Sequence, residues 1–404
     1  MTSLSVSVIV VSHGRPKALA RCLTGLSQLR YPAFETIVVA DSGAADVLDP
    51  WRDRIKIATY DDENISLARN IGIGQAAGDI LAFIDDDAVP EPDWLMQLTS
   101  GFVNDSVWAA GGYVVGRNGI SLQWGARLAR ADATTEPIDM TGETVKLVTG
   151  RPGAGAKTEG TNMAFRRVVF DRVGGFDPAY RFYLDETDLN LRIAAAGGVT
   201  AIVPTARVHH GFAESRRRRW DRVPRSLFEI GASLAVFLRR HGAGLDAETL
   251  RQEERGRQKA RLLNHMVAGR LEPRDVTRVL ATYDHGWTDG AARGLGPVPV
   301  PTSDGAFLTF DASGDSPAII LSGRIWQAKR RNQSARTRAQ AGETVILFLF
   351  SPTTFRHRVQ FTSDGVWMQT GGLFGASDRK DRVFRPWSFR SRVKREVARG
   401  FASF

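Results

Sequence analysis

The sequence predicts an α/β protein built on a mostly parallel sheet flanked by helices. Over the first hundred residues, short apolar runs alternate with helical patterns. The runs are nearly continuous, as in strands that are buried on both faces. Polar and turn-forming residues follow several of them, and ligands bind at this end of the strands in open α/β sheets. Alternation of this kind favours parallel strands joined by right-handed crossovers.

The first hundred residues supply four strands and three helices in regular order. The apolar runs that predict the strands lie at 6–11, 34–40, 55–60 and 80–84. Pro16 is expected near the start of a helix whose apolar residues recur at helical spacing through Leu29. We expect Ser66 to cap a helix that runs to Ala76, and a third helix to follow over 92–102.

The pattern is less regular after this region. A strand is expected at 108–116, whereas 117–157 has weak periodicity and many Gly, Thr and Asp residues and reads as an irregular or hairpin-bearing insertion. Regular signals then resume at 161–165 and 166–173, and a helix is expected at 186–196 and a short strand at 200–203.

The chain divides into three expected parts. Residues 1–215 form the α/β domain, and 216–293 form a basic helical connector. The run Gly294–Pro301 reads as a linker. Residues 302–404 form a small mixed or β-rich carboxyl-terminal domain of unknown role. Its expected strands lie at 318–321, 344–350, 357–361 and 365–368.

Charge is unevenly distributed along the chain. Residues 1–200 hold 19 Lys and Arg against 25 Asp and Glu, whereas residues 201–404 hold 35 against 19. This asymmetry suggests a catalytic or metal-binding part beside a part that faces an anion, with lipid, a diphosphate-bearing substrate and nucleic acid all open. One cysteine, Cys22, excludes an intramolecular disulfide and fits a reducing compartment. The amino terminus reads as a strand rather than a signal peptide, so a cytoplasmic location is expected.

Three consecutive aspartates, Asp85, Asp86 and Asp87, end the fourth strand. Adjacent carboxylates repel one another, so bringing them together in a fold favours a compensating partner. A hard divalent cation that also binds phosphates is the natural candidate. A solvated acidic turn is the alternative for this motif taken alone.

Six segments in order along the chain resemble the signatures of family 2 glycosyltransferases. They are 8–16 with 37–43, then 66–72, 83–87, 174–177, 184–189 and 208–210. The resemblance covers about residues 4–215. It implies the Rossmann-like GT-A fold, a nucleotide-diphosphate sugar donor, a divalent cation (Mn²⁺ or Mg²⁺) and inversion at the anomeric carbon.

The resemblance assigns the donor and metal sites to particular residues. It implies that Asp85 and Asp86 bind the nucleotide, with Asp86 at the ribose, and that Asp87 and His210 bind the metal. His209 stays an alternative to its neighbour. A metal ion there would bridge the diphosphate oxygens and neutralise charge as the sugar–oxygen bond breaks. A lone surface histidine is the competing interpretation of His210.

Asp41 and Arg69 are the other expected nucleotide ligands. The carboxylate of Asp41 can accept the imide N–H of uracil, which favours a UDP-linked donor. A turn-forming aspartate before Gly43 is the competing interpretation. Arg69 suits a phosphate or an aspartate of the metal site, and an ordinary helix-face arginine fits the pattern as well.

The catalytic base is expected in the acidic pair Asp185-Glu186. An alcohol is a poor nucleophile until its proton can leave. The family usually has Glu-Asp here, and this chain has the reversed order, so Glu186 occupies the base position and Asp185 is the second choice. Acidic residues at a helix start are also favoured by the helix dipole, which is the competing explanation.

The resemblance implies sugar transfer to a saccharide or lipid-linked acceptor in bacterial surface or exported polysaccharide synthesis. An inactive nucleotide-sugar-binding scaffold remains an alternative because the acidic pair is reversed. A nucleotidyltransferase is the second alternative. Such an enzyme would usually have a glycine-rich loop with a lysine, whereas residues 12–17 contain only one glycine, Gly14, and one lysine, Lys17.

The basic segment after this region suggests a membrane surface. Arg216–Arg219 and Trp220 precede the apolar run 227–238, a pattern similar to an amphipathic element at anionic lipid, so peripheral attachment to the inner membrane face is expected. A solvated basic loop followed by a core helix explains the pattern nearly as well. No nucleic acid partner is expected, since no binding motif accompanies the arginines. No apolar run approaches the ~20 residues that span a membrane.

Overall fold

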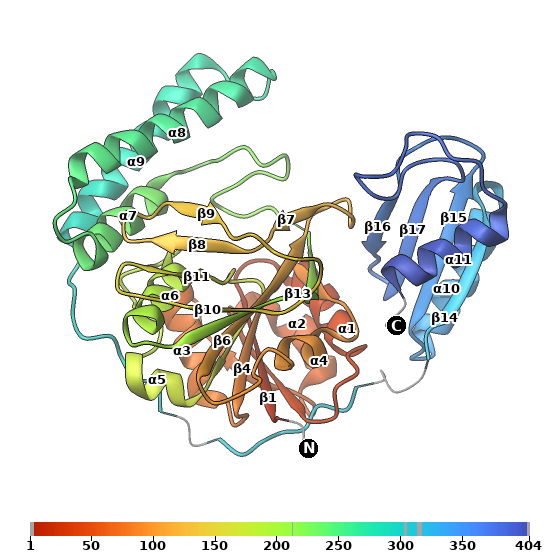
Figure 1. The fold of residues 1–404 in the computed structure, drawn as a ribbon, viewed down its shortest axis with the longest axis horizontal. Helices are drawn as coiled ribbons and strands as arrows, with labels where there is room; N and C mark the ends of the chain where they lie inside the picture. Colours follow the sequence, from red (N-terminus) through yellow and green to blue (C-terminus); the bar gives the residue numbers. More distant parts are fainter. Residues whose placement is uncertain (1–3, 212, 303–304, 313–316, 402–404) are drawn as a thin grey trace.

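The first half of the chain folds around one mixed sheet. The computed structural model describes residues 4–211, 213–302, 305–312 and 317–401 (Figure 1). Within these residues the sheet has ten strands, in the order β10-β13-β6-β12-β4-β1-β2-β3, with β5 beside β13 and β7 beside β6. Their bounds are β1 (Val6–Ser12), β2 (Phe34–Ala40), β3 (Lys56–Thr59), β4 (Ile80–Asp85), β5 (Ala88–Pro90), β6 (Val107–Val115), β7 (Leu122–Trp124), β10 (Lys146–Thr149), β12 (Met163–Arg166) and β13 (Val199–His210).

The centre of the sheet is parallel, as the sequence predicts. Strand β1 pairs in parallel with β2 and β4, and β2 pairs in parallel with β3. Alternate residues face opposite layers of helices: Val8 and Val10 belong to the apolar cluster beneath α1 and α4, and Ile9 to the cluster beneath α3, α5 and α6. These helices are α1 (Pro16–Leu26), α3 (Ile65–Gln75), α4 (Trp94–Thr99), α5 (Val168–Val173) and α6 (Asp185–Ala195). The carboxyl ends of β1, β2 and β4 therefore meet at one edge.

Two local expectations are corrected by the structure. Helix α3 is capped by Asn64, whose side chain accepts the N–H of Leu67 at 3.1 Å. Ser66 lies in the first turn and donates instead to the carbonyl of Tyr180. The strand expected at 200–203 is the longer β13, which continues beyond an irregularity in register between Val203 and Arg207. The extension carries the strand as far as His210.

The insertion at 117–157 contains hairpins. Strands β8 (Arg127–Arg130), β9 (Thr135–Pro137) and β11 (Ala154–Lys157) form a second, small sheet in the order β11-β8-β9. Strands β7 and β10 of the same region join the main sheet. The small sheet lies beside α6, with Gly155 against Ala194. This packing brings the end of β11 close to the start of α6.

Three helices form the basic connector, and the apolar one is a core helix. They are α7 (Phe228–His241), α8 (Ala247–Val267) and α9 (Pro273–Ala292). The apolar residues of α7, including Leu234 and Phe237, are buried. Helix α9 packs so closely on α7 that a Cβ at Gly286 would lie 1.9 Å from a carbonyl oxygen of α7. Residues 227–238 therefore form a core helix, which is the alternative to the membrane-surface interpretation, because their apolar face is covered by protein.

Part of the arginine run Arg216–Arg219, which precedes α7, contacts other residues of the protein. Arg216 and Arg217 pair with Glu63 at 2.7 and 3.1 Å, and Arg217 lies over the ring of Phe182. Trp220 is exposed. Among the described residues, no helix is long and apolar enough to cross a membrane.

The carboxyl-terminal domain is an α/β unit rather than a strand-dominated one. Its sheet has the order β14-β15-β17-β16, in which β14, β15 and β17 are parallel. The elements are β14 (Ile319–Arg324), α10 (Ala328–Gln340), β15 (Val345–Ser351), β16 (Arg358–Phe361), β17 (Val366–Gly372) and α11 (Phe389–Gly400). Helices α10 and α11 cover opposite faces of the sheet. Neither helix was predicted from the sequence, because both are rich in arginine and have short apolar stripes. In α10, for example, Ala335 is the buried residue.

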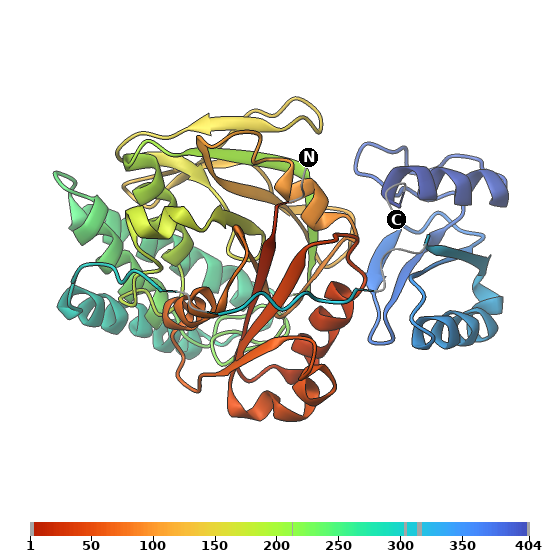
Figure 2. The same cartoon turned by 90° about the horizontal axis from the view of Figure 1, so that it is seen from below.

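The expected linker, Gly294–Pro301, packs on the surface of the first domain. Figure 2 shows it crossing the underside of that domain on its way to the carboxyl-terminal domain. Gly175 donates its N–H to the carbonyl of Pro299 at 2.7 Å, and the N–H of Phe310 bonds to the carbonyl of Phe34. The ring of Phe310 is buried in the main core. The three-part division of the chain remains a proposal, with the linker as part of the first domain's surface.

The carboxyl-terminal domain contacts the first domain near β6, β13 and α1. The N–H of Val359 bonds to the carbonyl of Asn118 at 2.9 Å, and Gln28 donates to the carbonyl of Gly365 at 2.8 Å. The ring centroids of His209 and Trp367 lie 4.9 Å apart. The domain therefore touches the strand that ends in His210.

Candidate active site

The three aspartates occupy different environments at the carboxyl end of β4. Asp85 ends the strand opposite Val11 of β1 and is partly exposed. Asp86 and Asp87 follow it, and both are buried. Asp86 and Asp87 form the turn between β4 and β5, and this turn leaves Asp85 more exposed than its two neighbours.

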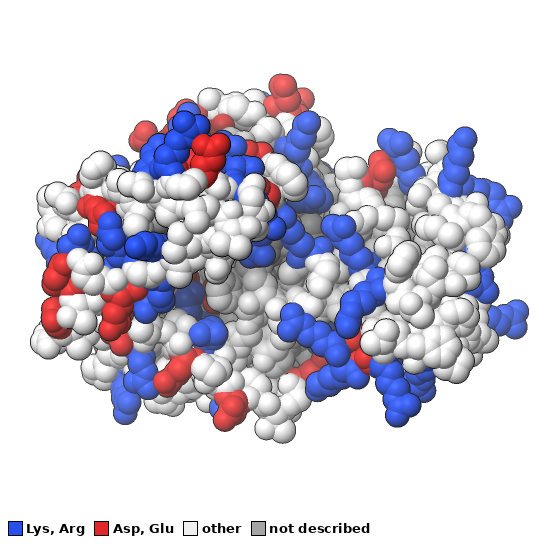
Figure 3. All heavy atoms as spheres, turned by 90° about the horizontal axis from the view of Figure 1, so that it is seen from above, with Lys and Arg blue, Asp and Glu red and all other residues white. Residues whose placement is uncertain are grey.

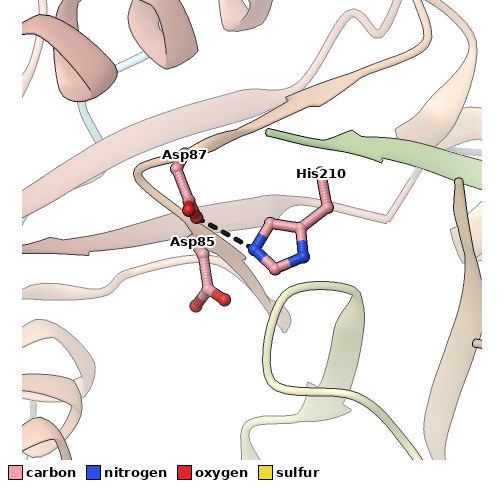
Figure 4. A group of neighbouring side chains, drawn as sticks. All are labelled: Asp85, Asp87 and His210. Atoms are coloured by element: carbon pink, nitrogen blue, oxygen red, sulfur yellow. Dashed lines mark hydrogen bonds and ion pairs between the residues drawn. The ribbon is translucent and has the colours of Figure 1, made fainter. Parts of the chain in front are cut away.

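Asp85 and Asp87 converge with His210 (Figure 4). One ligand atom from each of the three side chains lies within 4.8 Å of the others. The pairing of β5 with β13 sets His210 opposite Ala88, next to Asp87 in the chain. The Nε2 atom of His210 lies 3.1 Å from Oδ1 of Asp87, and its Nδ1 lies 3.1 Å from Gln123. His209 faces away, toward Glu91 at 3.0 Å.

Asp87 and His210 each favour the charged form of the other. Burial would raise the pKa of Asp87, but His210 and Arg15 outweigh it and the pKa lies well below the usual range. Burial would lower the pKa of His210, and the Asp87 carboxylate outweighs it, so the pKa of His210 is raised. An anionic aspartate with an imidazole nitrogen and a second carboxylate is a donor set that suits Mn²⁺ or Mg²⁺. The residues present therefore fit the divalent cation that the family implies.

The ribose contact predicted for Asp86 stays a prediction, and the structure shows this carboxylate in a buried network. Its carboxylate is fully buried, where it accepts from Ser12 at 2.7 Å and pairs with Arg15 at 2.6 Å. Burial raises the pKa of Asp86 to about 7, against the opposing charge of Arg15. Asp85 is more exposed than Asp86, and it lies with Asp87 beside His210.

Arg15 is a site residue that the sequence analysis did not single out. Its guanidinium reaches Asp87 at 3.4 Å as well as Asp86. It follows Gly14, whose N–H donates to Asp41 at 2.8 Å. The loop after β1 therefore joins the end of β2, where Asp41 was expected to bind the nucleotide, to the aspartates after β4. Its place in the 8–16 signature was the available signal, but nothing in that pattern indicated the partner.

The acidic pair begins α6 after a strained turn. Tyr183 and Leu184 both have positive φ values, 76° and 65°, which side chains other than glycine rarely adopt. Such residues cost of the order of 1–3 kcal/mol each and are concentrated at functional sites. The turn directs Asp185 and Glu186 to different partners.

Asp185 is held by Arg69 and Glu186 by Lys157. Arg69 forms a close ion pair with Asp185 and lies 3.7 Å from Asp85, so it joins the acidic pair to the metal group. Burial raises the pKa of Asp185 to about 7, in spite of Arg69. Burial would raise the pKa of Glu186 too, but Lys157 and Arg69 outweigh it and lower the pKa. The pKa values of the two carboxyl groups are therefore shifted in opposite directions, and Glu186 holds its proton less tightly than Asp185.

Lys157 was not predicted as a site residue. It ends β11, and its Nζ lies 3.0 Å from Glu186 and 2.9 Å from Glu159. Trp124 lies over the same ammonium, with the ring centroid 5.9 Å away. The surrounding region was expected to be irregular, so the sequence pattern held no sign that its last residue would meet α6.

Comparisons with known proteins identify the family of the first half of the chain. A family model described as glycosyltransferase like family 2 matches residues 4–226. The O-antigen biosynthesis protein RfbC of Myxococcus xanthus is 30% identical over 241 residues, which are 54% of this chain and 18% of that protein. A glucosyl-dolichyl phosphate glucuronosyltransferase of Haloferax volcanii is 31% identical over 43% of this chain and 56% of its own length. The chain thus spans between about a fifth and just over half of the length of these relatives.

Solved structures resemble the chain at low identity. A mannosyltransferase of Pyrobaculum calidifontis in complex with GDP-mannose and Mn²⁺ has a TM-score of 0.44 at 16% identity, over 74% of this chain and 78% of that one. GalNAc-T7 with UDP, GalNAc and Mn²⁺ has a TM-score of 0.45 at 17% identity, over 59% of this chain and 48% of that one.

The family match covers more than half of the chain and includes every strand of the main sheet. The predicted α/β GT-A class is confirmed, and a further small sheet follows it. This chain belongs to the glycosyltransferase family 2.

Proposed function

We propose that this chain transfers a sugar from a nucleotide-diphosphate donor to a hydroxyl acceptor with inversion of the anomeric carbon. The observation that carries the proposal is the convergence of Asp85, Asp87 and His210 beside a buried acidic pair. These groups lie at the carboxyl edge of the sheet, where ligands bind in α/β folds. Inversion in one step needs a base on the acceptor and charge neutralisation on the leaving diphosphate.

Glu186 is the proposed base. Its side chain is partly open, at 13% exposure, whereas that of Asp185 is 3% exposed and is occupied by Arg69. With its lowered pKa, Glu186 is ready to accept the proton of the acceptor hydroxyl at neutral pH. Asp185 and Arg69 position the start of α6 against the metal group.

Asp85, Asp87 and His210 would hold Mn²⁺ or Mg²⁺. The cation supplies charge neutralisation for the diphosphate as it departs. Asp41 lies at the end of β2 with a partly exposed carboxylate, which suits the imide N–H of uracil and supports a UDP-linked donor. Gly14 holds this carboxylate through its N–H.

The proposed acceptor is a saccharide or lipid-linked hydroxyl used in polysaccharide synthesis. This step rests on the names of relatives, which include an O-antigen biosynthesis protein, a succinoglycan biosynthesis protein and an N-acetylglucosaminyl-diphospho-decaprenol rhamnosyltransferase. Peripheral membrane association is part of the same proposal. It relies on the exposed Arg216 and Trp220, since α7 is buried.

The test is a panel of nucleotide sugars assayed for Mn²⁺-dependent hydrolysis and for transfer to lipid-linked and free saccharides. The proposal expects one UDP-sugar to be hydrolysed slowly with Mn²⁺ and not with a chelator. Tight donor binding without turnover across a broad acceptor panel would favour the inactive scaffold. Release of pyrophosphate from a nucleoside triphosphate in the presence of a sugar phosphate would favour a nucleotidyltransferase.

A further inference from the structure

The carboxyl-terminal domain contains a cavity of about 490 Å³ between the start of α11 and the loop before it. Five cationic side chains line it, and they are Lys380, Arg382, Arg385, Arg392 and Arg395. Among the described residues that form its wall, Asp381 is the one carboxylate. The cavity lies in a different domain from the metal group of the active site.

The neighbouring carboxylates are already shared among several donors. Asp381 accepts from Arg395 at 2.5 Å and from the N–H groups of Ser377 and Asp378. Glu396 is fully buried and forms an ion pair with Arg395 at 3.0 Å. It also pairs with Arg392 and Arg399 of the same helix, α11. These contacts leave little acceptor capacity for additional cations.

Three of the lining cations have no carboxylate partner. Lys380, Arg382 and Arg385 form no ion pair with any residue in the part of the chain that the structure describes. Arg385 instead lies over Trp387, with its guanidinium carbon 4.4 Å from the ring centroid. The guanidinium carbons of Arg392 and Arg395 lie 5.8 and 5.6 Å from the same centroid. Attraction to the ring offsets only part of the repulsion between these like charges.

Arg392 is fixed at the base of the cavity. Its side chain is 1% exposed, and its Nη2 and Nε lie 2.9 Å from His357 and 3.2 Å from Glu396. Burial lowers the pKa of Arg392 in spite of Glu396. A buried guanidinium held in one orientation, lining the same cavity as cations without a carboxylate partner, is arranged to receive an anion.

The domain as a whole carries the same excess of charge. Residues 302–404 hold 17 Lys and Arg against 8 Asp and Glu. Figure 3 shows Lys and Arg spread over this smaller lobe, with few acidic side chains among them. An excess of this size raises the local concentration of anions.

We propose that this cavity binds a phosphate-bearing anion. Guanidinium groups match the geometry of phosphate oxygens with paired N–H donors, which suits Arg385 and Arg392 on its walls. A volume of about 490 Å³ exceeds the need of a single phosphate, so the cavity accepts a diphosphate or a phosphate with an attached group. Trp387 and Phe384 supply an aromatic wall for that group. The phosphate belongs either to a soluble ligand or to a lipid headgroup.

The experiment uses the full chain in the presence of a chelator, so that the metal-dependent donor site does not contribute. Inorganic pyrophosphate is titrated by calorimetry into the wild type, the double variant Arg382→Gln/Arg385→Gln and a matched control. The control, Lys329→Gln/Arg330→Gln, removes an equal number of positive charges from exposed positions on α10 of the same domain. A second arm measures sedimentation with phosphatidylglycerol–phosphatidylcholine vesicles and with phosphatidylcholine vesicles alone.

Saturable pyrophosphate binding is expected in the wild type and the control. The Arg382/Arg385 variant should lose at least about tenfold in affinity, because each charge-assisted hydrogen bond contributes roughly that factor. Asp87→Asn should bind pyrophosphate as the wild type does, which separates this cavity from the donor site. Loss of binding to anionic vesicles in the same variant would identify the lipid headgroup as the source, and loss of pyrophosphate binding alone would identify a soluble ligand. Equal losses in the two double variants, or no binding of either probe by the wild type, would overturn the proposal.

Discussion

Replacing Lys157 with methionine should change the pH dependence of sugar transfer. The ammonium lies 3.0 Å from Glu186 and 2.9 Å from Glu159, and all three side chains are 12–13% exposed. Methionine keeps an unbranched stem of similar length and removes the charge. Two carboxylates would then face each other without the cation between them, so the pKa of Glu186 should rise.

The size of the effect follows from the distance. Unit charges 3.0 Å apart attract by about 5 kcal/mol at an effective dielectric constant of ~20. Water at the partly open side of the pair reduces this, and opposite charges at such distances lower a carboxyl pKa by about 1–3 pH units. Because the base must be ionised to accept a proton, a raised pKa makes the enzyme inactive over a wider acidic range. The acid limb of the rate profile should therefore move upward by at least ~1 pH unit.

The assay is the transfer rate under saturating donor from pH 4.5 to 9 for the wild type, Lys157→Met and Lys157→Arg. The arginine variant keeps the charge and should retain the wild-type acid limb. Thermal unfolding at pH 7 checks that both variants are folded. An unchanged acid limb in a folded Lys157→Met protein would refute the pairing of Lys157 with the catalytic base.

Three further predictions concern the base, the core and the domain contact. Glu186→Gln should lose at least ~100-fold in transfer rate, while its affinity for the nucleotide sugar, measured by calorimetry, stays within about twofold of the wild type. Asp185→Asn should lose less in transfer rate. Near-wild-type transfer rates in both variants would contradict the proposed mechanism. Glu35 is buried, yet ionic and hydrogen-bond partners lower its pKa, so its stabilisation is present at neutral pH and is lost as the pH falls below its usual value of 4.5. Glu35→Gln should thus lower the free energy of unfolding in urea by about 1.5–3 kcal/mol at pH 7, with a smaller difference at pH 3. Gly119→Val would place a Cβ 2.0 Å from the carbonyl oxygen of Val359 at a φ of +67°, so amide exchange at Val359 should accelerate; unchanged exchange would contradict the domain contact.

The strands of the main sheet could be predicted because they are buried on both faces and therefore appear as apolar runs. The same logic located Asp41 and Asp85, since polar residues at the carboxyl ends of parallel strands meet at one edge. The run of three aspartates held less information. Which of its members lie beside His210 depends on the turn at Asp86 and Asp87 and on the buried partner of Asp86, which is Arg15.

The parts that could not be predicted depend on contacts between distant segments. Lys157 reaches Glu186 only because β11 packs beside α6, and no periodicity in the irregular insertion indicates that packing. Helix α7 has an apolar face that suits a membrane as well as a protein core. The close approach of α9 to α7 at Gly286 shows that this face of α7 packs in the protein core. Helix α10 was missed because a helix with so few buried apolar residues has no stripe to detect.

The central claim is that Asp85, Asp87 and His210 hold a cation that binds the donor diphosphate. The most direct measurement is calorimetry of the nucleotide sugar with and without Mn²⁺, on the wild type and on Asp87→Asn. We expect Mn²⁺ to strengthen donor binding to the wild type by at least ~10-fold and to have no effect on the variant, because the cation loses an anionic ligand at the centre of the group. Equal Mn²⁺ enhancement in both proteins would contradict this claim.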